Sequence, residues 1–185
     1  LSVCISFDSR NNSPEFAQIA ANVLAANGIH VYIFEKLHPI ALMSYSVRAK
    51  KATAGIMITA SHNPKQWNAL KLLNEKGEFL NAEEGAAILE CAGQEDFSFA
   101  SVAELGQIEE RDFTDQHLDA VLELPAVDVD AVRKAGFKVV LDAVNSVGGI
   151  IMPRLLERMG VECICINCEP TGEFAHNPEP LPSNL

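Results

Sequence analysis

The order of apolar segments along the chain constrains its fold more than any other feature of the sequence. Residues 3–7 form a short apolar run typical of a strand, and residues 30–34 form a second one. Between them, Ser13 is expected to cap a helix that has Pro14 at its first position and ends at Asn27-Gly28. The apolar side chains expected on the buried face of this helix are Phe16, Ile19, Ala20, Val23 and Leu24. Such a short β-α-β unit predicts parallel strands with a right-handed connection.

The same alternation continues along the rest of the chain. The pattern predicts strands at residues 55–59, 69–73, 139–141 and 162–166, and helices at 40–51, 81–91, 115–123, 127–135 and 148–159. We therefore predict an α/β fold, with a mixed, mostly parallel sheet sandwiched by helices in residues 1–130. Residues 131–185 are expected to begin a second, similar α/β domain that continues beyond this chain.

Residues 93–115 differ in composition from the segments around them. This stretch holds seven acidic side chains and a single basic one, Arg111. We expect it to be a solvated surface connection.

Net charge and hydropathy exclude two classes of partner. A net charge of −11 argues against nucleic acid, which is held by clusters of Lys and Arg. No apolar run approaches the roughly 20 residues of a membrane span, so no membrane partner is expected. A small phosphorylated ligand needs only a local cationic pocket and stays compatible with the sequence.

The five cysteines do not form the pattern of a disulfide-rich scaffold. With no secretory leader in this sequence, we expect reduced thiols and a cytoplasmic location. Cys163, Cys165 and Cys168 can also be read as metal ligands. The alternation of Cys163 and Cys165 with isoleucines favours a buried strand instead.

The segment Thr59-Ala60-Ser61-His62-Asn63-Pro64 follows a predicted strand directly. Ligands of parallel α/β sheets bind at the carboxyl ends of strands, and Pro64 stiffens the loop by restricting Asn63. A structural turn capped by its own side chains is the alternative reading. A serine hydrolase is disfavoured, because neighbours on an extended loop point apart and no G-x-S-x-G motif surrounds Ser61.

This loop, followed by Asn68-Ala69-Leu70-Lys71, resembles the active-site loop of the α-D-phosphohexomutases, which include phosphoglucomutases, phosphomannomutases and phosphoglucosamine mutases. Further segments resemble other parts of that family, namely Asp8-Ser9-Arg10, Gly55-Ile56-Met57-Ile58, Asp142 with Asn145 and Gly148, Glu169-Pro170-Thr171-Gly172-Glu173-Phe174 and His176-Asn177-Pro178-Glu179-Pro180. The resemblance spans nearly the whole chain, and the serine loop is its most specific part.

The resemblance implies a mutase that moves a phosphoryl group between C1 and C6 of a hexose phosphate through a hexose 1,6-bisphosphate. Ser61 would carry the phosphate, and Mg²⁺ would bind Ser61 through that phosphate. Lys71 would stabilise the transferring group, and His62 would support the loop or move protons. Arg10, Asn63 and Lys71 would bind phosphate, with Arg10 alternatively holding the loop or pairing with Asp8.

Two departures from the family limit what this chain is expected to do. Ala69 stands where the family usually has Gly, and the family's Asp-rich magnesium loop and later domains are not in this sequence. We therefore expect the isolated chain to be inactive. The preferred sugar is expected to be mannose or glucose, with phosphoglucosamine mutase and a non-catalytic sugar-phosphate-binding module as alternatives. A nucleotide-binding domain is disfavoured because no G-x-G-x-x-G follows the first strand.

Overall fold

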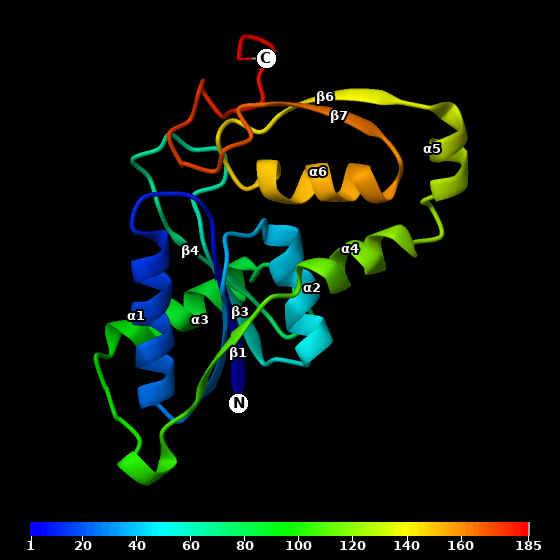
Figure 1. The fold of residues 1–185 in the computed structure, drawn as a ribbon. Coiled ribbons are helices and arrows are strands. Elements are labelled where there is room, and N and C mark those ends of the chain that lie inside the picture. The colour runs from blue at the N-terminus through cyan, green and yellow to red at the C-terminus, as the bar shows by residue number, and fades with distance from the viewer. Residues whose placement is uncertain (185) are drawn as a thin grey trace.

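The computed structural model describes residues 1–184, and its main element is a five-stranded sheet (Figure 1). The strands are β1 (Ser2–Phe7), β2 (His30–Phe34), β3 (Ala54–Ile58), β4 (Leu70–Leu73) and β5 (Ile108–Arg111). Their order is β4-β3-β1-β2-β5, and only β4 runs antiparallel to its neighbour. The prediction of a mixed, mostly parallel sheet is confirmed.

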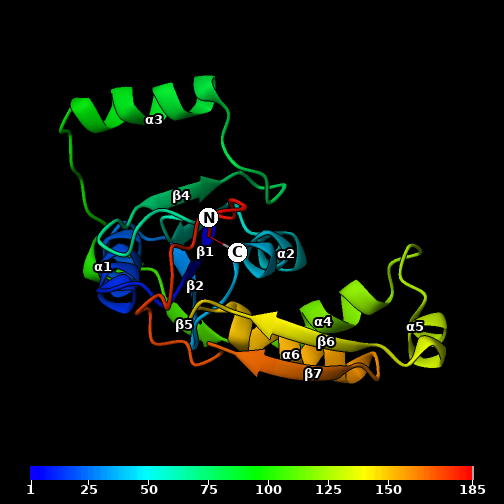
Figure 2. The same ribbon diagram turned by 90° about the horizontal axis from the view of Figure 1, so that it is seen from above.

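Helices α1 (Ser13–Ala26) and α2 (Ile40–Lys50) cover opposite faces of this sheet (Figure 2). Successive residues of β1 point to opposite faces. Cys4 packs in one buried cluster with Leu42 and Met43 of α2, whereas Ile5 packs in the other with Ala17 of α1. The sheet is therefore sandwiched by helices, as predicted.

The face that α1 turns to the sheet differs from the predicted one. The residues buried in α1 are Ser13, Ala17, Ala21 and Ala25. Phe16, Ile19 and Val23, which were expected inside, are 43%, 60% and 53% exposed and border an apolar groove of about 530 Å³. Small side chains let the helix backbone approach the sheet closely, so the helix buries its alanine face and leaves the larger apolar side chains exposed.

Helix α3 (Ala82–Gly93) lies beyond the β4 edge of the sheet (Figure 2). It begins with a capping box in which Asn81 and Glu84 satisfy each other's backbone amides, which confirms Asn81 as its cap. No residue of α3 is buried. No residue of α3 lines the apolar groove beside α1 either.

Strand β5 lies within the segment that was expected to be only a surface connection. It pairs in parallel with β2 at the edge of the sheet, after a short 3₁₀ turn at Val102–Glu104. His30 of β2 lies 3.1 Å from Glu109 of β5. Charged side chains suit a strand that is paired on one side only, which is why the hydrophobic pattern did not reveal it.

The chain continues after β5 with α4 (Thr114–Leu122), α5 (Val129–Ala135), β6 (Lys138–Asp142), α6 (Gly148–Arg158) and β7 (Glu162–Ile166). Strands β6 and β7 pair in parallel, as a β-α-β unit requires. Ile151 of α6 belongs to the same buried cluster as Leu42 and Met43 of α2. The second α/β unit is therefore present and packs against the first.

Strand β7 is more exposed than its apolar pattern predicted. Ile164 and Ile166 are 42% and 45% exposed, and the Sγ atoms of Cys163 and Cys165 lie 3.9 Å apart. Within residues 1–184, no group of three His, Cys, Asp or Glu side chains is arranged to hold a metal ion. The same residues include no helix long and apolar enough to cross a membrane.

His38 connects the β2–α2 junction to the start of α4. Its ring is buried, and its Nε2 lies 3.1 Å from Thr114 Oγ1 and 3.5 Å from Asp112 Oδ1. Burial lowers the pKa of His38, and the nearby Asp112 offsets only part of that effect. The unfolded chain therefore takes up a proton at this residue below about pH 6.5, while the folded protein resists it.

We expect the free energy of unfolding to be highest above pH 6.5 and to fall as the pH is lowered from 7 to 5. His38→Gln, which keeps a hydrogen-bonding group near Thr114, should flatten this dependence. Urea titrations followed by circular dichroism measure the slope, with His62→Gln on an exposed ring as the control. Identical slopes for wild type and His38→Gln would contradict the assignment.

Candidate active site

Asp8 and Thr59 leave the sheet side by side. They follow β1 and β3, neighbouring parallel strands in which Phe7 pairs with Ile58. Thr59 Oγ1 donates to Asp8 Oδ2 at 2.5 Å, and the Arg10 amide donates to Asp8 Oδ1 at 3.0 Å. Asp8 is buried, so these bonds replace the water that its carboxylate loses.

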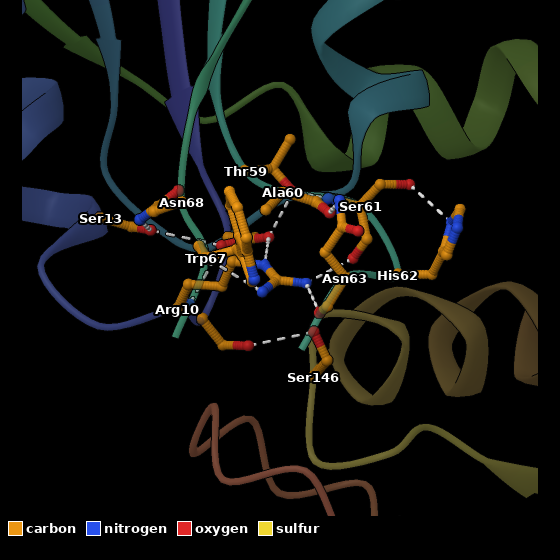
Figure 3. Close-up of polar contacts among 12 residues, drawn as sticks. Arg10, Ser13, Thr59, Ala60, Ser61, His62, Asn63, Trp67, Asn68 and Ser146 are labelled. Atoms are coloured by element: carbon orange, nitrogen blue, oxygen red, sulfur yellow. Dashed lines mark hydrogen bonds and ion pairs between the residues drawn. The ribbon is translucent and has the colours of Figure 1, made fainter. Parts of the chain in front are cut away.

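Arg10 holds the serine loop by its backbone (Figure 3). Its guanidinium is buried and donates to four loop carbonyls at 2.7–3.0 Å, those of Ser61, Asn63, Pro64 and Trp67. Burial lowers the pKa of Arg10, while Asp8, 3.4 Å from its Nε, acts in the opposite direction. These contacts show Arg10 holding the loop and pairing with Asp8, two of the roles considered for it from the sequence.

Ser13 belongs to this network and is not the cap of α1. The residue before the helix is Asn12, with φ of 60° and no side-chain cap. Ser13 Oγ donates to Asp8 Oδ1 at 3.3 Å and accepts a bond of 2.8 Å from Asn68 Nδ2. Ser13 thus links the start of α1 to the end of the serine loop.

Ser61 adopts a left-handed backbone conformation with φ of 58°. Its amide donates to Thr59 Oγ1 at 3.0 Å, and its side chain is exposed, 3.3 Å from His62 Nδ1. The expectation that Ser61 and His62 point apart was wrong, because the loop is not extended at Ser61. Left-handed conformations in non-glycine residues concentrate at functional sites.

Ser61, His62 and Lys71 line one cleft of about 320 Å³. Lys71 comes from β4 and is half-buried. Arg10 and Asn63 are not among the residues that line it. Asn63 instead donates from its side chain to the Ala60 carbonyl at 2.9 Å, as in the self-capped turn considered from the sequence.

The second unit forms the other wall of the cleft. Its lining residues there are Ala143, Val144, Ser146, Val147, Phe174 and Pro178. Ser146 Oγ lies 3.0 Å from Ser9 Oγ of the first unit (Figure 3). The loops that hold these residues were noted in the sequence, but no site role was predicted for any of them, since nothing local indicates that they face Ser61.

His176, noted in the sequence, and Trp67 lie away from this wall. His176 Nε2 is 3.3 Å from Asp142 Oδ2, and neither residue lines the cleft of Ser61. The Trp67 residue is 60% exposed, and its carbonyl is one of those bound by Arg10. Figure 3 places Trp67 on the Arg10 side of the loop and His62 on the other side.

The charge of the cleft suits an anionic ligand. Lys71 and His62 are its basic side chains, and its one carboxylate, Asp8, is buried and hydrogen-bonded. Val147, the residue directly before α6, also lines the cleft, and a helix N-terminus favours negative charge. An exposed hydroxyl beside a cationic wall can exchange a phosphoryl group with a bound molecule.

Two models of protein domains match this chain. A family model described as phosphoglucomutase/phosphomannomutase, alpha/beta/alpha domain I, matches residues 1–99. The model of domain II of the same family matches residues 115–185.

Individual relatives match along nearly the whole chain. A phosphoglucomutase/phosphomannomutase of Thermococcus kodakarensis is 32% identical over 99% of this chain and 40% of its own length. A protein of Methanosphaera stadtmanae named probable phosphoglucosamine mutase is 31% identical, with the same coverage. The crystal structure of a protein from Thermus thermophilus, assigned as a phosphomannomutase, superposes with a TM-score of 0.86 at 28% identity, covering 98% of this chain and 41% of that one. The chain thus spans about 40% of the length of these relatives, and it belongs to the phosphoglucomutase/phosphomannomutase family.

Proposed function

We propose that the whole protein is a phosphohexomutase that uses Ser61 to move a phosphoryl group between the C1 and C6 oxygens of a hexose. The observation that carries this proposal is the placement of Ser61. Its exposed hydroxyl lies on the cleft, on a loop whose carbonyls are held by a buried arginine. Phosphoryl transfer depends mainly on positioning and charge stabilisation, and such a loop supplies the positioning.

The proposed reaction consists of two transfers of opposite direction. A free hydroxyl oxygen of the hexose monophosphate attacks the phosphorus on Ser61, the bond to Ser61 Oγ breaks, and the hydroxyl proton is released as the serine hydroxyl is restored. The resulting hexose 1,6-bisphosphate turns around in the site. Ser61 Oγ then attacks its other phosphorus, loses its proton and takes that phosphoryl group, leaving the isomeric monophosphate.

Two side chains of the cleft have proposed roles in both transfers. Lys71 offsets the charge of the transferring group as a point charge. His62 Nδ1, 3.3 Å from Ser61 Oγ, is close enough to exchange the serine proton. Asn63 stays a predicted phosphate ligand, and the cleft itself offers no contact that supports this role.

We propose that the whole protein, and not this chain alone, binds the Mg²⁺ used in the reaction. Residues 1–184 contain no group of three His, Cys, Asp or Glu side chains arranged for a metal ion. The ligand proposed from this chain is the phosphate that Ser61 would carry, and the remaining ligands are proposed to come from the rest of the whole protein. The isolated chain is accordingly proposed to be inactive.

The substrate within the hexose phosphates follows from similarity alone. Relatives of comparable identity are named phosphoglucomutase/phosphomannomutase and probable phosphoglucosamine mutase. We propose that the substrate is a mannose or glucose phosphate. An assay with the phosphates of all three sugars tests this choice against the glucosamine alternative. A cytoplasmic location is proposed from the cysteines, which are unpaired in the described residues.

Replacement of Ser61 by Ala in the whole protein should reduce kcat by about three orders of magnitude or more, because the phosphoryl carrier is lost. A coupled assay with glucose 1-phosphate, magnesium and glucose 1,6-bisphosphate measures the rate. Ser101→Ala, at the cap of the 3₁₀ turn, is the matched control and should keep wild-type activity. Normal turnover by Ser61→Ala would sink the proposal, and tight substrate binding by a wild-type protein that never turns over would favour the binding module.

Replacement of Lys71 by Met should lower kcat by roughly a hundredfold or more while the protein stays folded, because one charge stabilising the transferring group is removed. Steady-state kinetics of the whole protein measure this effect. Lys76→Met, an exposed lysine in the turn after β4, is the control. An unchanged kcat for Lys71→Met would show that Lys71 is a solvated strand residue.

A further inference from the structure

Residues 171–174 of the second unit reach across to Arg10 of the first. The Phe174 ring lies over the Arg10 guanidinium, with Cζ 5.1 Å from the ring centroid. We propose that Phe174 is a positioning residue through which the second unit holds Arg10, and with it the Ser61 loop, in the ordered conformation. This inference extends the proposed function, since it gives the second unit control over the residue that carries phosphate.

The geometry of Arg10 explains why a face contact matters. The two terminal nitrogens of its guanidinium donate to the loop carbonyls and Nε lies 3.4 Å from Asp8, so a planar face is what remains for another partner. An aromatic ring on that face attracts the cation and keeps water from it. Without the ring, water can reach the guanidinium and compete with the carbonyls for its N–H groups.

The segment that carries Phe174 is anchored firmly in its own unit. Gly172 N donates to the Asn145 carbonyl at 3.0 Å, and Asn145 Nδ2 donates to the Glu173 carbonyl at 2.9 Å. Asn145 lies in the connection between β6 and α6, so the position of Phe174 follows the position of that unit.

Gly172 lets the two units approach closely. Its φ is +76°, and a Cβ atom added there would lie 2.0 Å from the Ser9 carbonyl oxygen. No other residue type fits without moving the two backbones apart. Lys65 and Glu173, whose charged atoms are 2.5 Å apart, add an ion pair from the serine loop to the same segment.

These contacts form a continuous path from the second unit to the serine. It runs from Asn145 to the backbone of residues 172–173, through the Phe174 ring to Arg10, and from Arg10 to the Ser61 carbonyl. Any shift of the second unit relative to the first moves Phe174 off Arg10 and loosens the loop. Order in the serine loop is therefore coupled to the seating of the second unit.

Hydrogen-exchange mass spectrometry of the whole protein tests this coupling without relying on catalysis. Phe174→Leu keeps apolar volume but removes the aromatic face, and it should speed exchange in peptides covering residues 59–68 by about three- to tenfold. Phe174→Tyr keeps the ring and should restore wild-type exchange there. Phe137→Leu, an exposed phenylalanine of the same unit, is the control and should leave the loop unchanged.

Gly172→Ala is a second variant that should loosen the serine loop, for use if Phe174→Leu folds poorly. Its added methyl group pushes residues 171–174 away from Ser9. It too should speed exchange in residues 59–68, while peptides of β6 and β7 keep wild-type rates. Equal loop exchange in wild type, Phe174→Leu and Gly172→Ala would overturn the inference, as would uniform acceleration across both units. Faster loop exchange in a protein whose Ser61→Ala variant is fully active would uphold the coupling and reject the phosphoserine mechanism.

Discussion

The buried guanidinium of Arg10 is the interaction on which the rest of the site depends. It donates to four carbonyls of one loop and lies beside the carboxylate of Asp8. A left-handed non-glycine residue such as Ser61 costs about 1–3 kcal/mol. Hydrogen bonds from a charged donor contribute roughly 1.5–3 kcal/mol each, so the arginine contacts outweigh the strain at Ser61. The exposed serine is thus held in a conformation that the loop alone would not favour.

The fold was predictable where local periodicity reports burial. The β-α-β units could be predicted correctly because their strands are short apolar runs and their helices have recognisable ends. Examples of such ends are Asn81 before α3 and Gly28 after α1. Strand β5 was missed because an edge strand has no need for an apolar pattern. The prediction of the buried face of α1 was wrong because both its alanines and its larger apolar residues recur at helical spacing. Only the close approach of the helix to the sheet favours burial of the alanines.

The site was predictable only in part. Ser61, His62 and Lys71 were identified from one motif, and the structure brings all three to one cleft. The contacts of Phe174 and Ser146 were missed, because Phe174 meets Arg10 and Ser146 meets Ser9 across more than a hundred residues of chain. The left-handed conformation of Ser61 was also missed, since the hydrogen bond to its carbonyl comes from Arg10, which follows a different strand.

The central claim is that Ser61 carries the phosphoryl group, and phosphate mapping tests it most directly. The whole protein is incubated with glucose 1,6-bisphosphate labelled in both phosphates, quenched in acid and digested, and the labelled peptides are sequenced by mass spectrometry. The account predicts label on the peptide that contains residues 59–64, at Ser61, and loss of that label when unlabelled glucose 6-phosphate is added before quenching. Label on another residue, or no covalent label in an enzyme that turns over its substrate, would contradict it.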